Sequence, residues 1–208
     1  MNDIGQSVGV LVSDCAATAA QAVLWENGTA TSLGSLGGTQ FDEGVAINDR
    51  GQVVGFSSLP GNTTFDAFFW SERTAMQDLG TLPGSVSSFA AGINNAGQIV
   101  GGSNDPDGGA RAFLIQDGIM SDLNTLIPAD STLFLVFAFD INSRGQIAGL
   151  AFDTVTQEFH ACVASPTVNV SVAGEGQRPY VQLPENARAL LRQHIPIRHF
   201  GVRTFLPQ

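Results

Sequence analysis

The chain has 208 residues, a net charge of −10 and no lysine, and 24 glycines and 14 phenylalanines accompany only 13% charged residues. Residues 1–173 are acidic and residues 174–208 basic, and because an acidic body repels phosphate we expect no nucleic acid to bind. The sequence shows no signal peptide, no apolar run of the about 18 residues of a membrane span, and too few cysteines for a disulfide scaffold or a cysteine zinc site.

Three short patterns recur along the chain with a period of about 46 residues. The pattern N-x-x-G-Q begins at Asn2, Asn48, Asn94 and Asn142, in steps of 46, 46 and 48 residues. An alanine followed by apolar residues recurs at Ala22, Ala67, Ala112 and Ala161. A Leu-Gly or Asp-Leu turn closes the first three units. The chain is therefore a tandem repeat of four units.

Each unit is predicted to form four short strands. The first unit opens at its Asn turn, so it keeps only three strands, over residues 4–34. Complete units start near residues 42, 88 and 134, and residues 167–172 supply the last strand of the fourth. In each N-x-x-G turn the asparagine is expected to cap the backbone and the glycine to adopt a positive φ.

The period predicts an all-β fold, a small β-propeller of about four blades over residues 1–173, with a β-solenoid as the structural rival. Trp25 and Trp70 are expected to be mostly buried between blades. Residues 174–208 are predicted to supply a closing strand (179–183) that pairs with the first unit, a short helix (185–193) and a basic tail. The alternative is a fragment that completes itself as a homo-oligomer.

Ring closure would bring Cys15 of the first unit close to Cys162 of the last. Two interpretations of these cysteines remain open, a pair of buried free thiols and a disulfide. Free thiols are favoured because the two positions are not equivalent within the repeat. The contact between the first and last units is the sharper expectation, since it exists only in a closed ring.

The units resemble the HAF repeat of bacterial extracellular proteins, written around I-N-x-x-G-Q-V-V-G, H-A-F-L-W and D-L-G-T-L-G-G. Residues 47–55, 67–70 and 78–84 match it most closely, and the resemblance covers about residues 2–164. The histidine of the motif survives only as His160; its counterparts are Gln21, Asp66 and Arg111. The resemblance implies an extracellular or periplasmic protein. Because repeat arrays often serve as binding or structural modules, the first function class is such a module, for a small molecule or a cell-surface ligand.

The sequence offers two kinds of candidate site residue, a histidine and several carboxylates, and the carboxylates are the stronger candidates. His160 is either a strand cap or the histidine of a catalytic triad, and no motif indicates a nucleotide or redox cofactor. Asp140 replaces the small residue of other units just before Asn142, and a charge that faced the propeller axis would need a partner or a cation. Asp140 with Asn142 is therefore a candidate metal site and Asp140 a candidate catalytic residue.

A second candidate metal site lies in the loop Asn104–Gly109, where Asp105 and Asp107 alternate beside two glycines. This resembles half of a calcium loop, although the glutamate that completes such a loop is missing and an ordinary acidic loop is the simpler interpretation. Calcium bound at either site would favour a second function class, a divalent-metal-dependent hydrolase of the propeller lactonase or esterase type. That class rests on analogy of fold.

Overall fold

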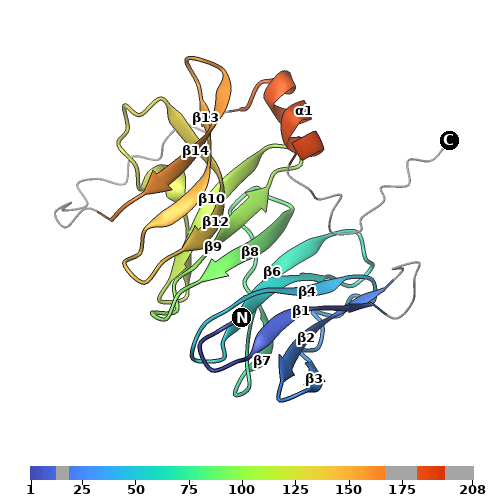
Figure 1. Ribbon diagram of the computed structural model, residues 1–208. Coiled ribbons are helices and arrows are strands. Elements are labelled where there is room, and N and C mark those ends of the chain that lie inside the picture. The colour runs from blue at the N-terminus through green and yellow to red at the C-terminus, as the bar shows by residue number, and fades with distance from the viewer. Residues whose placement is uncertain (13–18, 167–181, 195–208) are drawn as a thin grey trace.

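The computed structural model describes residues 1–12, 19–166 and 182–194, which form an all-β protein with one short α-helix (Figure 1). The strands of the first two units are β1 (Ser7–Val12), β2 (Ala20–Glu26), β3 (Thr29–Ser32), β4 (Asp42–Ile47), β5 (Val53–Ser58), β6 (Phe65–Ser71) and β7 (Ala75–Asp78). Those of the last two are β8 (Ser87–Ile93), β9 (Ile99–Asn104), β10 (Ala110–Gln116), β11 (Ile119–Asp122), β12 (Leu133–Ile141), β13 (Ile147–Asp153) and β14 (Glu158–Ala164). A 3-10 turn, η1 (Leu123–Thr125), follows β11, and the helix is α1 (Glu185–His194).

Every unit folds into its own antiparallel sheet, with the strands side by side in chain order. The sheets β4-β5-β6-β7 and β8-β9-β10-β11 have four strands, which confirms the predicted unit. The first sheet is β1-β2-β3 and lacks the strand before its Asn turn, as predicted. The last sheet is β12-β13-β14, and the fourth strand predicted at 167–172 lies outside the described residues.

The N-x-x-G-Q turn is closed by its asparagine and its glycine. Asn48 Oδ1 accepts hydrogen bonds from the N–H groups of Arg50 and Gln52 at 3.0 and 3.1 Å, and Asn48 Nδ2 donates to Gln52 Oε1 at 2.7 Å. Gly51 has a φ of 70°, in the region that favours glycine. The turns at Asn2, Asn94 and Asn142 have the same Asn–Gln bonds. The predicted capping role is confirmed.

The same asparagines also join neighbouring sheets in what we call the asparagine ladder. Asn2 Nδ2 donates to the backbone carbonyl of Asn48, Asn48 Nδ2 to that of Asn94, and Asn94 Nδ2 to that of Asn142, each at 3.0 Å. Asn2, Asn48 and Asn94 are buried, whereas Asn142, at the end of the ladder, is exposed. The ladder therefore holds the Asn turns of consecutive units in register.

Side chains packed between consecutive sheets form the core. Phe68 of the second sheet packs with Ala22 and Leu24 of the first, and Phe113 of the third packs with Val54 and Ala67 of the second. Each core is therefore shared by two neighbouring sheets. One antiparallel sheet cannot cover both of its own faces, so a unit of this kind is stable only when others stack on it.

The two tryptophans were expected to be mostly buried. Trp25 in β2 and Trp70 in β6 occupy equivalent positions, and Trp70 packs against the core between the first two sheets. Both are mostly buried, although neither is fully buried, which confirms the expected burial. Phe68, on the same strand as Trp70, is fully buried in that core.

In each complete unit, a bulge in the first strand lies opposite a glycine in the second strand. In β4 the register shifts between Gly44 and Ala46, which pushes the carbonyl oxygen of Glu43 toward Gly55 in β5. A Cβ atom on Gly55 would overlap that oxygen. β8 and β12 have the same kind of register shift. We call the glycine opposite the bulge the notch glycine.

The helix α1 confirms the predicted helix at 185–193 and packs on the third and fourth sheets. Leu183, Ala187 and Leu191 share a buried cluster with Ala110 of β10 and Phe134 of β12. Residues 179–181 of the predicted closing strand lie outside the described residues. The prediction that residues 182 and 183 pair with the first unit is wrong, because these residues lie beside the last two sheets. No described helix is long and apolar enough to cross a membrane.

The four sheets stack in chain order, and the first and last lie at opposite ends (Figure 1). The expectation that the first and last units touch is therefore wrong for the described part of the chain. Cys15 lies outside the described residues, so its relation to Cys162 stays a prediction. The stack has two end faces, one on each of the three-stranded sheets.

Candidate functional site

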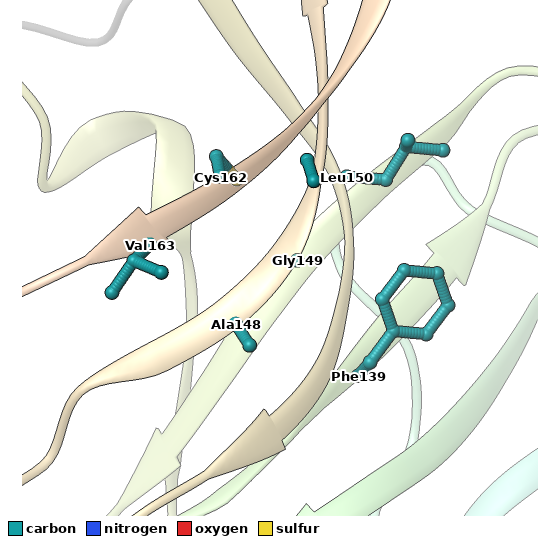
Figure 2. A pocket seen from close by; sticks show the side chains of 7 residues that line it. Phe139, Ala148, Gly149, Leu150, Cys162 and Val163 are labelled. Atoms are coloured by element: carbon teal, nitrogen blue, oxygen red, sulfur yellow. The ribbon is translucent and has the colours of Figure 1, made fainter.

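The outer face of the last sheet contains an open hollow of about 390 Å³. Its lining comes from all three described strands of that sheet, namely Phe139, Ala148, Gly149, Leu150, Ala161, Cys162 and Val163. Figure 2 shows the Phe139 ring on one side of β13 and the Val163 side chain on the other. We call this surface the terminal face.

The terminal face is open because no described sheet stacks on it. Val54 in β5 and Val100 in β9 hold the repeat position of Ala148, and both are 0% exposed because the next sheet covers them. Ala148 itself is exposed, and Val163 is 68% exposed. The terminal face thus presents to solvent the kind of surface that the two middle sheets bury.

The chemistry of the terminal face suits binding rather than covalent catalysis. Cys162 is the only ionisable residue in its lining, and its side chain packs against the core between the third and fourth sheets. Burial raises the pKa of this thiol, and a backbone hydrogen bond with Gly149 opposes the shift only in part. A thiol with a raised pKa stays protonated at neutral pH and is a poor nucleophile.

Asp140 lies at the end of β12 with its side chain exposed. Its Oδ1 accepts a hydrogen bond from the N–H of Ile141 at 2.8 Å. The backbone of Asp140 lies against Gly92 of the third sheet, where a Cβ atom would stand 3.0 Å from the Asp140 Cα. An exposed carboxylate is solvated, so the charge of Asp140 does not require a bound cation.

Asn142, the partner proposed for Asp140, is committed to its own turn. Its Oδ1 accepts from the N–H groups of Arg144 and Gln146, at 2.9 and 3.0 Å, and its Nδ2 donates to Gln146 Oε1 at 2.9 Å. The carbonyl oxygen that would ligate a metal is therefore already occupied by two donors.

Asp105 and Asp107 are each paired with an arginine. Asp105 is buried, with its Oδ1 3.2 Å from Arg111 and accepting from the Ser85 hydroxyl at 2.7 Å. Asp107 Oδ2 lies 3.1 Å from Arg188 of α1. The described residues contain no group of three or more His, Cys, Asp or Glu side chains arranged to hold a metal ion. The loop instead fastens α1 to the third sheet.

His160 is exposed in β14, paired with Ala151, whereas Asp140 is two strands away in β12 and paired with Ala148. The two candidate catalytic residues therefore lie three register positions apart along β13, and the fold does not bring them together. His160 stands within its strand rather than capping it.

One residue with unusual chemistry was not predicted as a site residue. Asp66 in β6 is only 8% exposed, and among the described residues its Oδ1 has no hydrogen-bond partner. Burial, and secondarily the charge of Asp78, raises the pKa of Asp66 to about 6. The alignment of the repeats could have identified Asp66, because this residue replaces the histidine of the HAF motif.

In the third sheet, an arginine with two carboxylate partners occupies the position that Asp66 holds in the second sheet. Arg111 occupies the equivalent position, and its guanidinium lies 3.1 Å from Asp122 and 3.2 Å from Asp105. These carboxylates raise the pKa of Arg111, although burial acts against them. In the second sheet, Asp66 and Asp78 stand in the places of Arg111 and Asp122, so an attraction is replaced by a repulsion.

The chain matches no family model and no curated protein sequence. The resemblance to HAF repeats accordingly stays an expectation drawn from the motifs.

Proposed function

We propose that this chain is an extracellular binding or structural module, an open array of propeller-type blades, and that it binds apolar protein segments through the terminal face. The observation that carries the proposal is the hollow of about 390 Å³ on the outer face of β12-β13-β14. Its lining is apolar, and it holds repeat positions that are buried between sheets elsewhere. Exposed apolar patches of this kind mark interaction sites.

The propeller class is part of the same proposal. Antiparallel sheets of up to four strands, stacked face to face at a period of 46 to 48 residues, are typical of propeller blades. A β-solenoid usually has shorter rungs than this unit. The extracellular setting comes from the HAF motifs, and binding is the common use of such repeat arrays.

The apolar dye 8-anilinonaphthalene-1-sulfonate tests the terminal face. We expect the dye to fluoresce with the full chain and the fluorescence to fall with Ala148→Arg, which places a charge in the hollow. Ala30→Arg in β3 is the matched control, because Ala30 is also exposed in a strand and lies outside the lining. Equal fluorescence from both variants would refute binding at the terminal face.

A metal-dependent hydrolase is the second candidate, and the orphaned oxygen of Asp66 beside Asp78 is the observation in its favour. A calcium titration followed by thermal melting separates the two functions, because an ion that binds only the folded state raises its melting temperature. We expect no shift at millimolar calcium. A shift that disappears in Asp66→Asn or Asp140→Asn, together with cleavage of esters or lactones, would replace the binding module by the hydrolase.

A further inference from the structure

The strand β1 is an unprotected edge at the other end of the stack. In the described residues it is hydrogen-bonded to β2 on one side only. Its sequence, SVGVLV, contains neither a charged residue nor a proline, and its pairing with β2 has no register shift. Leu11 and Val12 are 49% and 46% exposed. Proteins usually block such edges with charges, prolines or bulges, because a free edge pairs readily with another strand.

The other sheets show which strand belongs beside β1. The second strands β5, β9 and β13 each pair on both sides, and the neighbour on the side that β1 leaves open is always an antiparallel first strand with a register shift. The notch glycines Gly55, Gly101 and Gly149 receive carbonyl oxygens from the bulged first strands, at Glu43, Phe89 and Phe137. A side chain at any notch glycine would overlap that oxygen.

Gly9 holds the notch position in β1, seven residues after Asn2, just as Gly55 follows Asn48. Its φ lies outside the left-handed region, so its backbone conformation does not demand glycine. A Cβ atom on Gly9 would meet only the Trp25 ring, at 3.3 Å, and no backbone oxygen. The notch is present, and the described structure contains no strand that uses it.

We propose that the free edge of β1 is a strand-acceptor site, which takes an antiparallel, bulged strand from a partner polypeptide and receives its bulge carbonyl at Gly9. The partner chemistry is that of the first strand β8: an extended, uncharged segment with small residues at the bulge, ending in Ile-Asn. Such recognition gains affinity from backbone hydrogen bonds along the edge and selectivity from the notch. This site is independent of the terminal face.

A fluorescent peptide of residues 85–94 is the probe, because it contains β8 with its bulge and no charged side chain that the acidic body would repel. We expect saturable binding to the full chain, measured by anisotropy. Gly9→Ala should weaken it by about tenfold or more, because overpacking a close contact is costly. Val12→Thr, on the same strand but away from the notch, should bind as the wild type does. No binding, or equal binding by Gly9→Ala, would overturn the proposal.

A second measurement does not depend on a free peptide. The chain extended by residues 85–93 in place of Met1 restores the Ile-Asn junction before Asn2 and should melt several degrees higher than the wild type. The same extension in Gly9→Ala should give no rise. An extension that leaves the melting temperature unchanged overturns the proposal. A dimer of the unextended chain that Gly9→Ala leaves intact also overturns it, since two straight β1 strands would then be pairing without the notch.

Discussion

At the scale of single residues, Asp66 in β6 and Arg111 in β10 occupy the same repeat position with opposite charges. Arg111 is paired with Asp105 and Asp122, whereas Asp66 is buried with one oxygen unpaired among the described residues and is close to the like charge of Asp78. The second sheet therefore tolerates a carboxylate that costs stability whenever it is ionised. Protonation, a cation or substitution would each relieve that cost.

Stability should therefore fall as pH rises through the pKa of Asp66. The folded-state pKa of about 6 lies above the ordinary value of 3.8, so the folded state binds the proton more tightly than the unfolded state. The stabilisation is complete below about pH 4 and is lost as the pH rises above about 6, a change of about 3 kcal/mol in full and of about 2 kcal/mol between pH 4.5 and pH 8. Urea unfolding of the wild type and Asp66→Asn at pH 4.5 and pH 8 measures it. A pH dependence that Asp66→Asn leaves unchanged would assign it to another group.

The asparagine ladder offers a matched pair of residues for a second prediction. The Asn94 side chain is buried and bonds both its own turn and the carbonyl of Asn142. The Asn142 side chain is exposed and, among the described residues, bonds only its own turn. Asn94→Ala should cost about 2 kcal/mol and Asn142→Ala about 1 kcal/mol or less, because only the first loses the bond between sheets. Equal losses in chemical denaturation would mean that the ladder adds nothing beyond the turn.

At the scale of elements, the contact of β6 with the first sheet depends more on its phenylalanine, Phe68, than on its tryptophan, Trp70. Phe68 is fully buried between the first two sheets, and Trp70 on the same strand is mostly but not fully buried. Phe68→Ala should therefore cost about 3–5 kcal/mol, as for a large core aromatic, and Trp70→Ala about 1–2 kcal/mol. Denaturant titration of the two variants ranks them, and a larger loss for Trp70 would reverse our assignment of the core.

The strands and turns were predictable from the sequence because their causes are local. Asn48 and Gly51 close one turn by contacts within five residues, and the alternation of the neighbouring strands follows from burial. The bond from Asn48 to Asn94, the notch at Gly55 and the unpaired oxygen of Asp66 were missed. Each depends on a neighbouring strand or sheet whose approach a repeat pattern does not specify.

At the scale of the whole molecule, counting strands predicted a closed ring, but the described chain is an open stack. A strand count carries no information on the angle between sheets, and the angle decides whether the ends meet. Leu183 and α1 cover the third and fourth sheets instead of reaching the first. The candidate site changed for the same reason, because an open stack leaves the terminal face and the edge of β1 exposed.

Because each core is shared only by consecutive sheets, stability should be distributed along the chain like that of a one-dimensional array. The second and third sheets have a neighbour on both faces, whereas the first has one. Its strands should then open first, and the chain should fray from that end without losing the middle. Native-state hydrogen exchange would show this as amides of β1 and β2 exchanging faster than those of β5 and β9. A protease would meet the same gradient, cleaving the first unit while the rest of the array stays folded.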